Sequence, residues 1–164
     1  MIFLVNDANI LIDLLKIDLL DSFFRLAYDF QVTDMVLAEI QEENAVDLQS
    51  FLGDGLLARQ AFSYEELLEI QLLETKNPGL SIPDCSCLYL CRKLAATLLT
   101  GDAALRRAAE QQAIPVHGIL WCFDEIVAGG IIPPFEAGEK LRRLIALNPR
   151  LPERECRKRL KAYS

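Results

Sequence analysis

The first fifteen residues constrain the fold most, because a buried strand, an acid and a helix follow one another without a gap. The apolar residues 2–5 are enough for a short buried strand, and the pattern becomes helical from Ile10 onward. Asp7 stands between them, at the carboxyl end of the predicted strand. Ligands bind at that edge of open parallel sheets, so Asp7 is either a ligand-binding residue or the N-cap of the next helix.

The same order of strand, acid and helix returns near residue 100. Residues 96–100 form the clearest apolar strand after the first, and they end in Gly101-Asp102 before a helical pattern over 103–110. Asp102 could also be an N-cap. Capping, however, does not require two strands to bring carboxylates to one edge of a sheet, so the repetition indicates a shared site.

Two further acids lie near the starts of predicted helices. Glu39 lies in a helix predicted over 35–43, where an acid in the N-terminal part is favourable for dipole reasons alone. Asp84 ends the sequence Ser81-Ile-Pro-Asp84, whose first and last residues can form a capping box. Capping and the helix dipole therefore explain each of these acids when it is considered singly.

Strand and helix patterns alternate along most of the chain. This alternation predicts a three-layer α/β/α fold with a central parallel sheet of about five strands, followed by C-terminal helices. Residues 45–60 have no clear pattern apart from a turn at 53–55. The predicted strands are 2–5, 30–33, 61–62, 96–100 and 114–118; the predicted helices are 10–26 with a break near Asp18 or Asp21, 35–43 with an N-cap at Thr33 or Asp34, 63–75, 82–95, 103–110, 119–128, 135–147 and a basic helix after Pro152.

Length and composition favour one globular domain. The chain has 164 residues and is 52% hydrophobic, which excludes a disordered protein. We expect residues 1–130 to form the main domain and residues 131–164, which begin near two prolines, to form a helical extension packed on it. The apolar start has no basic leader, and polar residues interrupt it too early for a membrane span, so a cytoplasmic location without membrane contact is expected.

Cysteine and histidine usage limits the other kinds of site. Five cysteines are an odd number in a chain with no secretory signal, and we expect them to be buried and free rather than disulfide-bonded or bound to zinc. His117 is the only histidine, which excludes a multi-histidine metal site. We expect His117 to be an ordinary strand residue.

Charge is unevenly distributed along the chain. Residues 139–164 contain nine basic and three acidic residues and therefore carry +6. Because the net charge of the whole chain is −7, the remaining residues carry −13. The acidic body argues against a surface that coats nucleic acid generally. The basic tail either guides RNA or an acidic partner, or is a solvated helix face.

The four acids can meet at one edge of the predicted sheet. With right-handed crossovers Asp7 and Asp102 share an edge, and Glu39 and Asp84 reach it from N-terminal helical turns. Carboxylates gathered in this way repel one another unless cations bridge them. Oxygen ligands without cysteine or histidine favour Mg²⁺ or Mn²⁺ over zinc, and such ions activate water for phosphate-ester hydrolysis.

Four motifs follow one another across residues 2–119: Val5-Asn-Asp-Ala-Asn-Ile-Leu-Ile12, Val36-Leu-Ala-Glu-Ile40, Ser81-Ile-Pro-Asp84 and Leu99-Thr-Gly-Asp102. Together they resemble those of the PIN-domain nucleases, which include the toxins of VapBC-type toxin-antitoxin pairs. By that resemblance, residues 1–130 would be a PIN-like nuclease domain, and the chain would be an endoribonuclease that cleaves single-stranded RNA and leaves 5′-phosphate ends.

The resemblance also implies a set of site residues, a cofactor and partners. It implies Mg²⁺ or Mn²⁺ as cofactor, a homodimer and, for a toxin, an antitoxin protein. Ala103 and Ala104 stand where many relatives have a further acid or an asparagine, which would weaken a second metal. The implied catalytic and metal-binding residues are Asp7, Glu39, Asp84 and Asp102, with Asn9 and Thr100 as polar supports.

Two other hypotheses stay open alongside the nuclease. One is a PIN-like fold with a degenerate site that only binds RNA or a protein. The other is a flavodoxin-like receiver, which needs a lysine after the final strand, where this chain has Pro115-Val-His-Gly118. Arg106 and Arg107, which follow Asp102, are either phosphate contacts or solvated surface residues.

Overall fold

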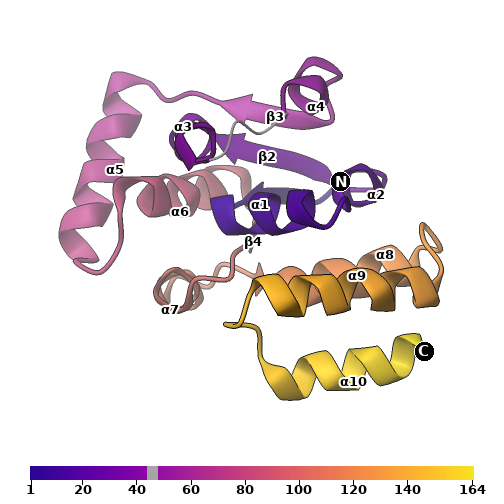
Figure 1. Cartoon of the computed structure of the whole chain (residues 1–164). Coiled ribbons are helices and arrows are strands. Elements are labelled where there is room, and N and C mark those ends of the chain that lie inside the picture. Colours follow the sequence, from indigo (N-terminus) through magenta and orange to yellow (C-terminus); the bar gives the residue numbers. More distant parts are fainter. Residues whose placement is uncertain (44–47) are drawn as a thin grey trace.

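Five parallel strands form one sheet in the computed structural model, which describes residues 1–43 and 48–164 (Figure 1). The strand order is β3-β2-β1-β4-β5, and helices flank the sheet to give three α/β/α layers. The predicted fold class is thereby confirmed. The strands are β1 (Phe3–Asn6), β2 (Asp29–Thr33), β3 (Leu57–Gln60), β4 (Thr97–Leu99) and β5 (Val116–His117).

Local signals explain where several helices begin and end. Ser63 and Ser81 each close a capping box, as their sequences predict. Asp18 has a φ of 54° and separates the first two helices at one of the two predicted breaks. The helices are α1 (Ala8–Lys16), α2 (Leu20–Phe23), α3 (Asp34–Glu43), α4 (Gln49–Gly53), α5 (Tyr64–Lys76), α6 (Ile82–Leu94), α7 (Ala103–Gln111), α8 (Ile119–Ala128), α9 (Pro134–Leu147) and α10 (Glu153–Tyr163).

The centre of the sheet is the point where the strand order reverses. β1 pairs with β2 on one side and with β4 on the other, with Val5 opposite Leu98 and Asn6 opposite Leu99. Val5, Leu98 and Leu99 are fully buried, as expected for strands covered on both faces. In open α/β sheets the carboxyl ends at such a reversal form the ligand-binding crevice.

The edge strand lies earlier in the chain than predicted. Residues 61–62 are not a strand; β3 is formed by Leu57–Gln60, which pairs with β2. Leu57 is fully buried opposite Phe30, so long-range pairing and burial select this segment over its more apolar neighbour. The preceding stretch without a clear pattern contains α4, and residues 45–47 of it lie outside the described residues.

The C-terminal helices are attached to the rest by polar contacts as well as by packing. α9 and α10 lie side by side below the sheet in Figure 1. Lys140 Nζ donates to the carbonyl oxygens of Ile17 and Asp18, at 3.0 and 3.1 Å. Asp124 of α8 accepts hydrogen bonds from Arg159 and Tyr163 of α10. In the turn between α9 and α10, Asn148 Nδ2 donates to Asp13 Oδ2 of α1 at 3.0 Å, which holds this turn beside α1.

All five cysteines are free and buried, as their number and context predict. Burial raises the pKa of the Cys91 thiol to about 12, so this side chain stays protonated and packs as a small apolar group. Across the described residues, no helix has both the length and the apolar character needed to cross a membrane.

Candidate active site

Asp7 is a buried carboxylate at the carboxyl end of β1. The residue is 5% exposed. Oδ1 accepts a 2.8 Å hydrogen bond from the backbone N–H of Ala8, and Oδ2 accepts from Thr100 Oγ1 at 2.7 Å and Asn9 Nδ2 at 3.1 Å. Asp7 is therefore the N-cap of α1, which is one of the two roles expected for it. Its carboxylate is also held by the side chains of Asn9 and Thr100, which come from two segments.

Thr100 and Asn9 connect the end of β1 to the end of β4. Thr100 Oγ1 donates to Asp7 and accepts from the backbone N–H of Asp102 at 3.0 Å. Asn9 Oδ1 accepts from the backbone N–H of Gly101 at 2.9 Å. These bonds fix the loop that carries Asp102 beside Asp7, at the reversal of strand order.

Asp84 and Asp102 both cap helices. Asp102 Oδ1 accepts from the backbone N–H of Leu105 at 2.9 Å at the start of α7. Asp84 Oδ2 accepts from the backbone N–H of Ser81 at 3.0 Å in the capping box of α6. Each of these bonds engages one oxygen of its carboxylate, and a carboxylate has lone pairs on both oxygens for other partners.

The charges of two other acids act on Asp7. Burial raises the pKa of Asp7, and the negative charges of Asp84 and Asp102 raise it further, against the lowering effect of the hydrogen bonds from Thr100 and Ala8. A carboxylate with a raised pKa is one whose negative charge is not fully compensated by its surroundings. Asp84 and Asp102 therefore form an electrostatic group around Asp7.

Glu39 is related to this group because its charge acts on the same buried thiol as the charges of Asp7 and Asp84. Cys87 of α6 is fully buried, and its pKa is raised well above the usual value by burial and then by negative charges that include Asp7, Asp84 and Glu39. Glu39 lies on α3 and is partly exposed. Three of the four acids that the sequence predicts to share a site therefore raise the pKa of the same buried thiol.

The donor chemistry suits a hard divalent cation, but the side chains as placed do not enclose one. Carboxylate oxygens are the preferred ligands of Mg²⁺ and Mn²⁺, and the raised pKa of Asp7 indicates uncompensated negative charge that a cation would offset. Among the described residues, however, no three histidine, cysteine or acidic side chains are grouped closely enough to hold a metal ion. Chemical type and charge fit the ion, whereas the present spacing does not.

Sequence reasoning missed a set of buried polar side chains beneath these acids. Asn6 is fully buried and donates to the carbonyl oxygens of Leu4 and Gln31, while its Oδ1 has no hydrogen-bond partner among the described residues. Thr33 Oγ1 and Ser86 Oγ lie 2.9 Å apart, which links the end of β2 to α6. A polar residue inside an otherwise apolar strand or helix pattern was the available signal.

A cleft of about 860 Å³ is lined by Asp102 but not by Asp7, Glu39 or Asp84. It runs from Asn9, Thr100 and Asp102 to residues 147–152, in the turn between α9 and α10. Arg106 lines this cleft, whereas Arg107 is exposed and lines a separate hollow. Arg106 and Arg107 were expected to be either phosphate contacts or solvated surface residues, and of the two only Arg106 lines the cleft beside Asp102.

Together, the parallel α/β/α fold and the acids at its strand reversal define an open-sheet α/β protein with a candidate site at its ligand-binding edge. A family model described as a PIN domain matches residues 3–164. The chain belongs to the PIN-domain family, which confirms the resemblance seen in its motifs, and PIN domains are generally nucleases. No curated protein matches the chain.

Proposed function

We propose that the chain is a metal-dependent endoribonuclease that cleaves single-stranded RNA. One observation carries the proposal: Asp7 is buried at the strand reversal, is held by Thr100, and has a pKa raised in part by Asp84 and Asp102. Acids arranged with uncompensated charge at a ligand-binding edge are typical of a catalytic site. Membership of a nuclease family supports the same conclusion.

The chain's own residues have distinct roles in this proposal. Asp7, Glu39, Asp84 and Asp102 would hold Mg²⁺ or Mn²⁺, which when bound supplies water activation and stabilises charge on the phosphate. Thr100 and Asn9 hold the Asp7 carboxylate in one orientation through Oδ2. That oxygen is therefore positioned before any ligand arrives, which reduces the cost of ordering the site.

A direct assay tests the proposal. End-labelled single-stranded RNA of mixed sequence is incubated with the protein and Mn²⁺, with EDTA in a parallel reaction, and the products are resolved on a denaturing gel. We expect cleavage that EDTA and Asp7→Asn both abolish. Asp54→Asn, which removes an exposed acid in the turn after α4, is the matched control and should cleave normally. Cleavage that survives Asp7→Asn contradicts the proposal.

The alternative is a PIN-like module that binds RNA without cleaving it. The capping bonds of Asp84 and Asp102, and the spacing of the acids among the described residues, favour this candidate. Calorimetry with Mn²⁺ at millimolar concentration separates the two. Heat of binding that Asp7→Asn removes supports the enzyme, and RNA binding in EDTA with no Mn²⁺ binding supports the module.

Two protein partners complete the proposal, both on the basis of the family resemblance: an antitoxin and a second copy of the chain. Light scattering coupled to size-exclusion chromatography tests the second copy, because it measures mass independently of shape. Co-purification with the product of the adjacent reading frame, followed by a cleavage assay of the complex, tests the antitoxin. A neutralised complex and an active free chain are the expected pair of results.

A further inference from the structure

The cleft beside Asp102 is more basic than the protein as a whole. Its walls contain Lys16, Arg106, Arg150 and Arg159 against two acids, in a chain whose net charge is −7. Arg159 is neutralised by Asp124 and Glu155. Over the described part of the chain, Lys16, Arg106 and Arg150 form no ion pair. The charge of Lys16 acts on the nearby Asp13, so Arg106 and Arg150 are the charges that remain available to a ligand.

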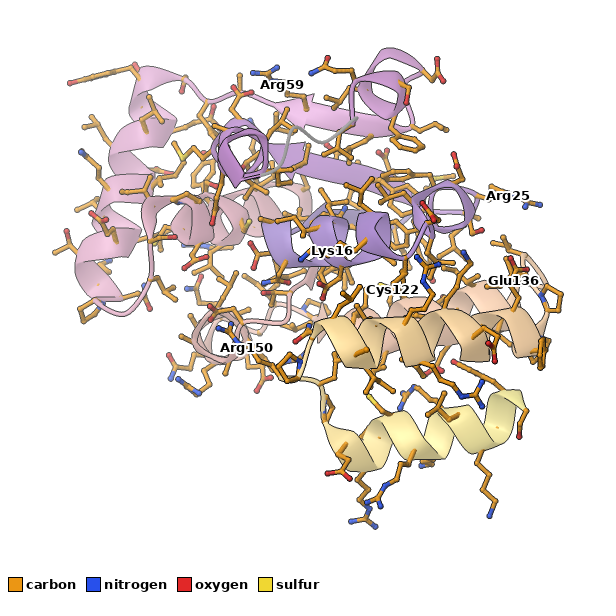
Figure 2. All side chains as sticks on the ribbon, in the orientation of Figure 1. Lys16, Arg25, Arg59, Cys122, Glu136 and Arg150 are labelled. Carbon is orange, nitrogen blue, oxygen red and sulfur yellow. The ribbon has the colours of Figure 1, made fainter. Side chains whose placement is uncertain are left out.

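Lys16, Arg106 and Arg150 come from three separate segments of the chain. Figure 2 shows Lys16 on α1 and Arg150 at the turn between α9 and α10. Arg106 reaches the cleft from α7. Its guanidinium lies against Gly118, with Nη2 only 3.3 Å from the position that a Cβ atom would occupy at that glycine. Positive charges from three segments thus line one cleft, as is suitable for a chain of phosphates.

An aromatic pair forms another part of the wall. The rings of His117 and Trp121 are stacked, with centroids 4.4 Å apart and planes 4° from parallel. Both side chains are partly buried and line the cleft. Burial and the nearby Arg106 lower the pKa of His117, so its imidazole is neutral at physiological pH.

We propose that this cleft binds a single-stranded RNA segment, with a base against the His117–Trp121 pair and phosphates at Arg106 and Arg150. Aromatic surfaces and basic grooves are the usual means of binding unpaired strands, because unpaired bases are free to stack. A duplex keeps its bases inside the helix and cannot use the pair in this way. The bound strand would pass Asp102, so this substrate-positioning role rests on the proposed function.

Trp121 provides a direct probe, because it is the only tryptophan in the chain. The full-length protein is titrated in EDTA with short oligoadenylate, with an abasic strand of the same length, and with an oligoglutamate of matched charge. We expect only oligoadenylate to quench Trp121 fluorescence strongly. Equal quenching by oligoglutamate, as an acidic protein partner would produce, overturns the proposal, and so does oligoadenylate binding that leaves the fluorescence unchanged.

Variants separate the phosphate contacts from the aromatic contact. Arg106→Ala and Arg150→Ala should each weaken oligoadenylate binding about tenfold and reduce the salt slope by about 0.7 per lost phosphate contact. His117→Ala should weaken binding of oligoadenylate but not of the abasic strand. Arg25→Ala, an exposed arginine outside the cleft, is the matched control. Arginine variants that behave like Arg25→Ala contradict the proposal.

The experiment distinguishes failure of the cleft from failure of the enzyme. Binding is measured without metal, so a protein that binds oligoadenylate through Trp121 but never cleaves RNA keeps the cleft and loses the proposed function. Cleavage that Arg106→Ala and Arg150→Ala leave unchanged keeps the enzyme and overturns the cleft. Circular dichroism melts of each variant show whether it is folded, and Arg150, exposed in a turn, is the substitution least coupled to folding.

Discussion

Thr100 Oγ1 donates a 2.7 Å hydrogen bond to Asp7 Oδ2, although the two residues are 93 positions apart in the chain. Parallel pairing of β1 with β4 places their carboxyl ends next to each other, and this bond joins them. The same hydroxyl accepts from the backbone N–H of Asp102. One small side chain therefore connects two of the acids proposed to bind metal.

Replacing Thr100 with valine should destabilise the protein. Thr100→Val keeps the shape but removes the donor to Asp7 and the acceptor for Asp102, and groups left unpaired in this way cost about 1–3 kcal/mol. The hydrogen bond from Thr100 lowers the pKa of Asp7 in the wild type, so removing this bond should raise that pKa further. Urea unfolding at neutral pH measures the loss, and Thr75→Val, which removes an exposed hydroxyl on α5, is the control. Equal losses in the two variants would contradict the prediction.

Divalent ions should stabilise the wild-type protein against heat. A ligand that binds only the folded state adds about 2.7 kcal/mol when its free concentration is about a hundredfold above Kd. Differential scanning fluorimetry should therefore show a Tm that rises with Mn²⁺ in the wild type and in Asp54→Asn. Asp7→Asn should abolish this dependence, because it removes the central carboxylate. An unchanged response in Asp7→Asn would place the ion elsewhere.

The buried Asp7 should make stability depend on pH in a defined direction. Its folded pKa is raised above the usual 3.8, chiefly by burial, so the folded state binds a proton more readily than the unfolded state. The stability of the wild type relative to Asp7→Asn should therefore be greatest below pH 3.8 and decrease as pH rises through the raised pKa. Urea unfolding of both proteins in EDTA across this range measures the difference. The prediction is contradicted if the free energy of unfolding of the wild type, relative to that of Asp7→Asn, increases as pH rises.

Asp84 has a capping role and a proposed metal role, and two substitutions separate them. Ser81→Ala removes the capping hydroxyl and should cost about 1 kcal/mol of stability while RNA cleavage persists. Asp84→Asn keeps an oxygen that accepts from the backbone N–H of Ser81 but removes the charge, so cleavage should be lost with little change in stability. Denaturant unfolding and the Mn²⁺-dependent cleavage assay are run on both. Cleavage lost in Ser81→Ala and kept in Asp84→Asn would assign Asp84 to capping alone.

Local patterns in the sequence were enough to predict the units of the fold. Hydrophobic runs that end in Asp7 and Asp102 predicted strands followed by helices, and Ser81 with Asp84 predicted a capping box. These features depend on residues within a few positions of one another, so they can be recognised without knowing the fold. The edge strand could not be located, because Leu57 is selected by pairing with Phe30 and by burial.

The sequence by itself determined which carboxylates stand at strand ends and helix starts, because that placement is local. Only the tertiary structure decided that β1 lies beside β4, which gives Asp7 its bond to Thr100 and brings Asp84 and Asp102 within electrostatic range. It also placed Arg106 and Arg150, which are far apart in the sequence, in the lining of one cleft. Strand order and helix docking depend on contacts between distant segments, and no local pattern contains them.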